Sequence, residues 1–94
     1  MASQVHASHI LVKTEDEANR ILKRITDGED FIAVAKRFSS CPSRKNGGDL
    51  GWFGKGVMAP EFEQAAFAAD AGKVVGPVKT QFGYHLIEII SRTM

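Results

Sequence analysis

Apolar and polar residues alternate with a period of two near both ends of the chain, over residues 5–12 and 84–90. Such alternation predicts β-strands whose successive side chains point to opposite faces of a sheet. His9 shares its face of the first strand with three apolar residues, Val5, Ala7 and Leu11. His85 shares its face of the last strand with Ile87 and Ile89. We therefore expect both histidines to face the core.

Between these strands the apolar spacing becomes helical. Thr14 and Glu17 have the spacing of a capping box, in which hydroxyl and carboxylate satisfy free backbone N–H groups at a helix start. The helix that follows has an apolar stripe made of Ala18, Ile21, Leu22 and Ile25. Gly28 ends this helix, because glycine accepts a left-handed backbone.

Two more helices are expected. Asp30 is a candidate cap for a helix whose core face is Phe31, Val34, Ala35 and Phe38. Pro60 suits the first turn of a short third helix, which Gly72 ends. The apolar face of that helix is Phe62, Ala66 and Phe67.

The remaining segments complete the order of elements. Residues 39–48 are polar and rich in turn formers, so we predict a loop there, followed by a short strand over residues 49–53. Residues 76–80 predict an edge strand with Pro77 near its start. The order strand-helix-helix-strand-helix-strand-strand predicts an α+β fold, with a four-stranded antiparallel sheet packed against about three helices. The 94 residues are enough for a single domain, 1–94, and too few for two.

Charge and cysteine content narrow the partners and the compartment. The formal net charge is +1, so neither nucleic acid nor a stable membrane association is expected. Four basic residues lie close together in the sequence: Lys36, Arg37, Arg44 and Lys45. They belong either to a solvated helix end and loop or to an anion site. Cys41 is the only cysteine, which fits a reducing compartment, and no apolar run is long enough to span a membrane. We expect a cytoplasmic protein, although a domain from an exported protein would have the same composition.

Three kinds of chemistry are open to the histidines and the thiol. If the first and last strands are neighbours, the imidazoles of His9 and His85 meet in the sheet, as structural residues or as the floor of a pocket. A metal site at His6 and His9 is disfavoured, because residues three apart on a strand point to opposite faces. A thiol hydrolase using Cys41, a histidine and Asp49 lacks any local nucleophile signature. We expect no metal and no cofactor.

Several motifs together resemble one known family, the parvulins. The segments that carry the resemblance occur in the family's order and span positions 8 to 87: Ser8-His9-Ile10-Leu11-Val12-Lys13, Cys41-Pro42-Ser43, Gly47-Gly48-Asp49-Leu50-Gly51, Gly56-Val57-Met58, Pro60-Glu61-Phe62-Glu63, Ala66-Phe67, Gly76-Pro77-Val78 and Thr80-Gln81-Phe82-Gly83-Tyr84-His85-Leu86-Ile87. The short chain is most similar to small bacterial or archaeal parvulins. The resemblance implies a peptidyl-prolyl cis-trans isomerase that assists protein folding.

The resemblance also implies a role for individual residues. His9 and His85 match the paired histidines beneath the parvulin active site, and Thr80 matches a hydroxyl in the hydrogen-bond network of that pair. Cys41 matches a position that carries Cys or Asp. The apolar cup for the substrate proline matches three residues, Leu50, Met58 and Phe62. Phe82 falls on the turn that lines the site, where other members carry a smaller residue. Read by pattern alone, a group such as Leu50, Met58, Phe62 and Phe67 more often forms a packed core than a pocket.

One departure from the family concerns substrate choice. Phospho-specific parvulins have an extended basic loop after the first strand, whereas here Lys13 leads directly into the acidic residues 15–17. An acidic segment repels phosphate, so no preference for phospho-Ser/Thr before proline is expected. The expected partners are proline-containing peptides and unfolded proteins, bound by a monomer without covalent chemistry. A peptide-binding chaperone module that uses the same groove without catalysis is the alternative.

Overall fold

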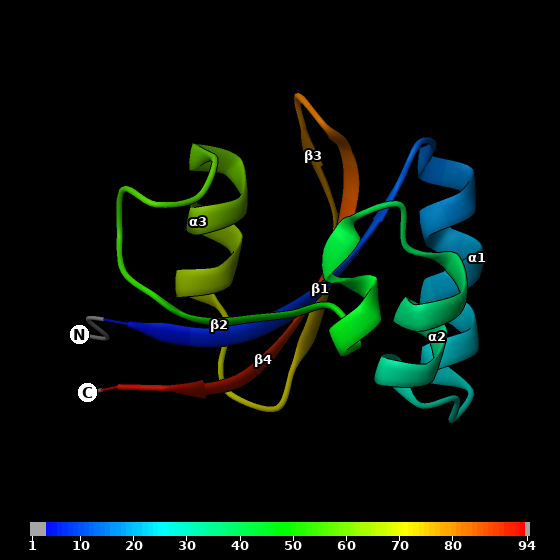
Figure 1. Cartoon of the computed structure of the whole chain (residues 1–94), viewed down its shortest axis with the longest axis horizontal. Coiled ribbons are helices and arrows are strands. Elements are labelled where there is room, and N and C mark those ends of the chain that lie inside the picture. The colour runs from blue at the N-terminus through cyan, green and yellow to red at the C-terminus, as the bar shows by residue number, and fades with distance from the viewer. Residues whose placement is uncertain (1–3, 94) are drawn as a thin grey trace.

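The computed structural model describes residues 4–93 as an α+β fold (Figure 1). In chain order the elements are β1 (Val5–Val12), α1 (Glu15–Thr26), α2 (Phe31–Phe38), the 3₁₀-helix η1 (Pro42–Asn46), β2 (Asp49–Phe53), α3 (Pro60–Ala68), β3 (Val74–Thr80) and β4 (Gly83–Arg92). The predicted order of strands and helices is confirmed.

The four strands form one antiparallel sheet in the order β2-β1-β4-β3. The first and last strands are therefore the two central ones. Their register pairs His9 with Ile87 and Leu11 with His85. The two histidines lie diagonally across the β1–β4 pair on the same face, and diagonal neighbours are within reach of ring side chains.

Helices α1 and α2 cover one face of the sheet. The Thr14 hydroxyl accepts the Glu17 N–H (3.2 Å) and the Asp30 carboxylate accepts the Ala33 N–H (3.1 Å), so both predicted N-caps are present. The buried cluster under these helices consists of Ile10, Val12, Ala18, Ile21, Phe31, Val34, Ala35 and Leu86. Ser8, on the same side of β1 as Ile10 and Val12, is also buried (2% exposed).

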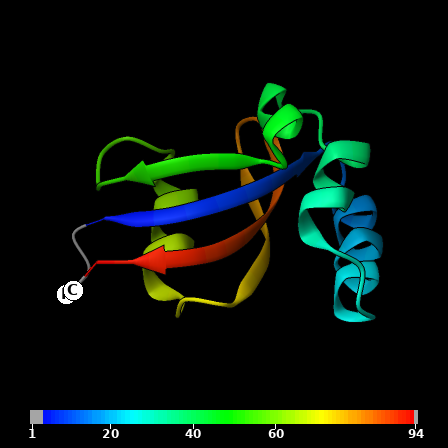
Figure 2. The same cartoon turned by 60° about the horizontal axis from the view of Figure 1, so that its bottom comes forward.

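Helix α3 lies on the opposite side of the strands from α1 and α2, as Figures 1 and 2 show. Its buried cluster consists of Val5, Ala7, Phe53, Phe62, Ala66, Ile87 and Ile89. Successive residues of β1 and β4 thus contribute to opposite cores, since their side chains alternate between faces. His9 and His85 belong to the face on the α3 side.

Some predicted boundaries and one predicted loop differ from the structure. Residues 39–48 are not all loop, because η1 makes a turn and a half within them. Strand β3 begins at Val74 rather than at residue 76, and its pairing with β4 is irregular between Val75 and Val78. Helix α3 ends at Ala68, before the predicted stop at Gly72, because Ala69 is already extended (φ −91°, ψ 150°).

Candidate active site

A cavity of about 400 Å³ lies on the α3 side of the sheet, and its wall is almost entirely apolar. It is lined by His9, Leu11, Ser40, Cys41, Pro42, Leu50, Met58, Ala59, Phe62, Thr80, Phe82 and His85. All eight residues predicted from the sequence as catalytic or substrate-binding are in this set. The sheet contributes the floor, α3 and the segment before it one wall, and the residues around Cys41 and the β3–β4 turn the others.

The floor of the cavity is a pair of imidazoles. The Nδ1 atoms of His9 and His85 lie 3.0 Å apart, and the ring planes are nearly parallel (18°). Phe62 from α3 stands edge-on to both rings, with centroids 5.7 Å from His9 and 5.2 Å from His85. Both histidines are 5% exposed. The pair is therefore held by contacts from three elements.

Thr80, at the end of β3, joins the hydrogen-bond network of the pair. Its Oγ1 accepts the Phe82 N–H (3.2 Å) and lies 2.7 Å from His85 Nε2. If the Thr80 hydroxyl donates to His85 Nε2, the proton of His85 sits on Nδ1 and is donated to His9 Nδ1. The proton of His9 then sits on Nε2, a buried atom without a hydrogen-bond partner among residues 4–93. In this arrangement the series of hydrogen bonds from Thr80 through His85 to His9 ends at His9 Nε2.

Burial keeps both imidazoles uncharged at neutral pH. Desolvation, and secondarily repulsion from His85, lowers the pKa of His9 to about 4. Desolvation also lowers the pKa of His85. Burial removes the hydration that stabilises a charged imidazole, so the neutral form is favoured. The cavity floor is accordingly polar but without net charge.

Residues 7–91 match the model of the rotamase family, whose description is the PPIC-type PPIase domain. The chain belongs to this family. The foldase protein PrsA of Geobacillus sp. (strain WCH70) is 50% identical over 90 residues, which are 95% of this chain and 33% of that protein. The chain thus spans about a third of the length of the curated relatives it matches.

Solved structures of two relatives match this PPIase domain closely. NmPin, the parvulin of Nitrosopumilus maritimus, is 40% identical with a TM-score of 0.87, covering 97% of this chain and 99% of that one. The peptidylprolyl isomerase PrsA of Bacillus anthracis is 40% identical with a TM-score of 0.96, covering 99% of this chain and 43% of that one. The parvulin resemblance and the expected fold are confirmed.

The segment that carries Cys41 in this PPIase domain is fixed by Ser39, which sequence reasoning missed. The buried Ser39 hydroxyl accepts the backbone N–H of Leu11 (3.1 Å) and of Cys41 (3.3 Å). The Ser40 N–H in turn donates to the Leu11 carbonyl (2.7 Å). Half-buried Cys41 is thereby held at the cavity wall, immediately before η1.

The apolar residues near α3 divide between cavity and core. Leu50, Met58 and Phe62 line the cavity, whereas Phe67 does not line it and packs against the core cluster. Sequence reasoning also missed four lining residues, Leu11, Ser40, Pro42 and Ala59. Leu11 and Ala59 adjoin predicted site segments, but only the folded chain shows that they face the same cavity.

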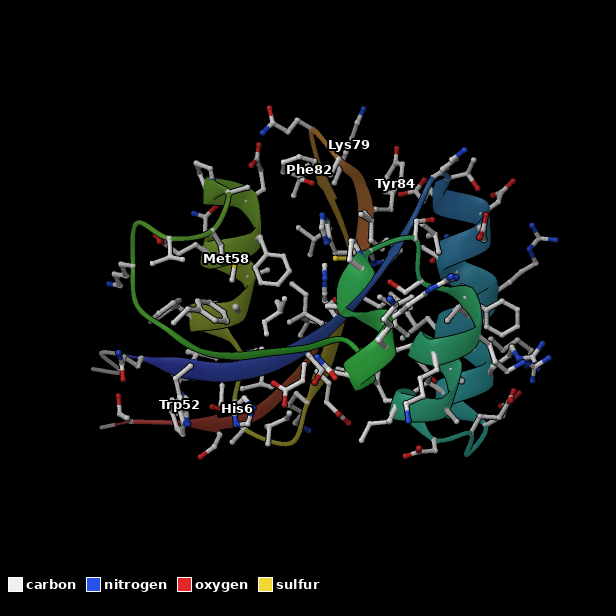
Figure 3. The ribbon with its side chains drawn as sticks, in the orientation of Figure 1. His6, Trp52, Met58, Lys79, Phe82 and Tyr84 are labelled. Atoms are coloured by element: carbon white, nitrogen blue, oxygen red, sulfur yellow. The ribbon has the colours of Figure 1, made fainter. Side chains whose placement is uncertain are left out.

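His6 takes no part in the site, although it is three residues from His9. Its Nε2 lies 2.9 Å from Asp49 Oδ1, and its ring lies 5.4 Å from that of Trp52. Figure 3 shows His6 and Trp52 on the other side of β1 and β2 from Met58 and Phe82. Within residues 4–93 no three His, Cys, Asp or Glu side chains are grouped as a metal site would require.

Proposed function

We propose that this domain isomerises X-Pro bonds of flexible or unfolded polypeptides without covalent chemistry and without a preference for phospho-Ser/Thr before proline. The observation that carries the proposal is the apolar cavity above the uncharged His9–His85 pair, in a chain of the PPIC-type PPIase family. Leu50, Met58 and Phe62 have the size and polarity to grip a pyrrolidine ring.

The chemistry requires no bond to be broken. Rotation about a peptide bond loses amide resonance, which sets a barrier of about 18–20 kcal/mol. A catalyst needs only to bind the twisted amide more tightly than either planar form. A cavity with almost no polar wall favours the twisted form, since the planar amide is the more polar one. The imidazole pair orders the floor and keeps it free of charge.

The surroundings of Cys41 support a non-covalent route. Both Nδ1 atoms of the histidine pair bond to each other, and His85 Nε2 bonds to Thr80. The remaining ring nitrogen, His9 Nε2, has no hydrogen-bond partner within the described part of the chain, which includes Cys41, so it does not reach the thiol. A cysteine nucleophile is normally activated by an adjacent base. Cys41 has no histidine in that position.

The start of α1 supports the lack of phosphate preference. Thr14 caps the helix directly after β1, so there is no extended loop, and Glu15, Asp16 and Glu17 fill the first turn. Carboxylates at this edge repel a phosphorylated side chain. Matched peptides with Ser-Pro and phospho-Ser-Pro should be turned over at similar rates, or the unphosphorylated one faster. Faster turnover of the phosphopeptide contradicts this part of the proposal.

Several properties of the whole protein stay predictions. The relative named foldase protein PrsA supports unfolded proteins as substrates. A monomer without nucleic-acid or stable membrane partners, in the cytoplasm, is what the balanced charge and the lone thiol favour. No helix within residues 4–93 has the length and apolar character needed to cross a membrane.

The test is exchange NMR on unphosphorylated Ala-Pro and Phe-Pro peptides with catalytic amounts of the protein. We expect cis/trans exchange peaks to appear with the wild type and to weaken strongly with Met58→Ala and with folded Phe62→Ala. Val57→Ala is the matched control, because Val57 is 67% exposed and does not line the cavity. Peptide binding without faster exchange would make this domain a recognition module, and the isomerase proposal would then be withdrawn.

A further inference from the structure

The main chain of His9 is in contact with a residue that has no side chain, Gly48. The His9 N–H donates to the Gly48 carbonyl (2.9 Å). A Cβ built on Gly48 would lie 2.1 Å from the His9 carbonyl oxygen and 3.1 Å from its nitrogen. Real Cβ atoms are essentially never found within 3.0 Å of a nonbonded heavy atom, so the Cβ at position 48 and the His9 carbonyl oxygen would have to move about 1 Å farther apart. Only glycine allows this approach.

Contacts with η1 and α2 limit how far Gly48 can move away from His9. Its N–H donates to the Ser43 carbonyl of η1 (2.9 Å). The preceding residue, Gly47, is so close to α2 that a Cβ there would lie 2.5 Å from Ile32 Cγ2. Because η1 and α2 restrict residue 48, a side chain at this position would displace His9 instead. The N–H and C=O of His9 face β2, so the pressure is directed toward β4, where His85 lies.

We propose that Gly48 is a positioning residue that sets the separation of the His9–His85 pair. The Nδ1–Nδ1 distance is 3.0 Å, and N–H hydrogen bonds ordinarily span about 2.7–3.2 Å, so moving His9 by about 1 Å toward β4 takes the two nitrogens out of hydrogen-bonding geometry. The effect on the imidazole pair rests on the geometry alone. The effect on turnover rests on the proposed isomerase function.

The experiment compares Gly48→Ala with Gly51→Ala. Both glycines have a left-handed backbone, φ +83° and +70°, so alanine is strained at either position. A Cβ on Gly51 meets no atom of residues 4–93 other than its chain neighbours within 4 Å, so the control carries the same strain without the contact. The imidazole ¹⁵N and N–H signals report on the histidine pair, and exchange NMR at several peptide concentrations gives kcat and KM.

We expect Gly48→Ala to lose the imidazole signals of the hydrogen-bonded pair and to lower kcat by on the order of ten- to a hundredfold, with less effect on KM. Gly51→Ala should keep both the signals and kcat. Unchanged imidazole signals in folded Gly48→Ala overturn the proposal, whatever happens to turnover. Lost signals with unchanged turnover sustain the positioning role and contradict a part for the pair in catalysis.

If Gly48→Ala does not fold, a measurement on the wild-type protein tests whether Gly48 positions the His9–His85 pair. Native-state hydrogen exchange at increasing urea reports when the His9 N–H, which donates to Gly48, is released. If Gly48 positions the pair, the imidazole N–H and the His9 amide exchange through the same opening, with the same dependence on urea. An intermediate that keeps the imidazole pair while the His9 amide exchanges would overturn the proposal.

Discussion

The two faces of the sheet are built from the same strands and differ in how completely they are filled. On the α1–α2 side Ile10 and Leu86 are 0% exposed within an apolar cluster, and Ser8, on the same side of β1, is 2% exposed. On the α3 side the neighbouring residues His9 and His85 form the floor of a cavity of about 400 Å³. One step along either strand changes the environment from packed core to open cavity.

This difference separates stability from function within one sheet. The packed face follows the rule that interiors are filled at nearly crystalline density. The α3 face departs from it twice, by leaving a cavity and by burying two imidazoles, of which His9 Nε2 has no hydrogen-bond partner in the residues that the structure describes. Each departure costs stability. Substitutions on the two faces should therefore have separable effects.

The largest effect is expected on the packed face. Ile10→Ala should lower the free energy of unfolding by about 2–5 kcal/mol, as is usual for a large buried aliphatic side chain. Turnover per folded molecule should not change, because Ile10 faces away from the cavity. Urea unfolding measures the first and exchange NMR the second. Ile90→Ala is the matched control, since Ile90 is 44% exposed. Equal losses in both variants would contradict the assignment of the packed core.

The next effect is a loss of stability in acid caused by His9. Its pKa is about 4 in the folded chain and ordinarily 6.5, so between these values the unfolded chain binds a proton that the folded chain does not. The free energy of unfolding therefore falls as the pH falls from 6.5, by about 3 kcal/mol at pH 4. His85, whose pKa is also lowered, acts in the same direction. Urea midpoints measured across this range test the sign.

The control for the acid effect is His9→Asn, which removes the titrating ring. Its stability should depend less steeply on pH between 6.5 and 4 than that of the wild type. The same slope in both proteins would show that the acid sensitivity comes from other groups.

A smaller effect is expected from the hydroxyl beneath the pair. Thr80→Val leaves His85 Nε2 and the Phe82 N–H without their partner, and an unsatisfied buried group costs about 1–3 kcal/mol. The imidazole N–H signals should shift, because His85 Nε2 loses its hydrogen bond with Thr80. Thr80→Ser keeps the hydroxyl and should preserve both signals and turnover. Identical imidazole spectra for the Val and Ser variants would contradict this network.

The smallest effect on turnover is expected at Cys41. Cys41→Ser and Cys41→Asp should keep activity within a few-fold, because no step uses the thiol as a nucleophile. Loss of a group that transfers protons or attacks the substrate typically costs about a hundredfold or more. Exchange NMR on a Phe-Pro peptide measures the difference. Complete inactivation of a folded variant would support the nucleophile hypothesis.

Local patterns in the sequence were sufficient for most elements and for the two histidines. The alternation of β1 and β4 and the caps at Thr14 and Asp30 depend on neighbouring residues, so they could be predicted. The meeting of His9 and His85 depended on the strands being neighbours, which the sequence left open and the topology supplies.

What the sequence did not show depends on contacts between distant segments. Ser39 has two backbone partners, one of them 28 residues away in β1. Gly48 is recognisable as a turn former, but its contact with His9 exists only when β2 lies beside β1. Likewise, the early start of β3 at Val74 follows from its pairing with Glu88, which local propensity cannot report.

The most direct test of this account is to add a Phe-Pro peptide to isotopically labelled protein and follow methyl and imidazole signals by NMR. If the α3 face holds the proline site, Leu50, Met58 and the His9–His85 pair should shift together at one affinity. Signals from Ile10, Ile21 and Leu86 on the packed face should stay in place. Shifts that gather on the packed face, or that leave the imidazole pair and Met58 unaffected, would contradict the central claim that this cavity binds the substrate proline.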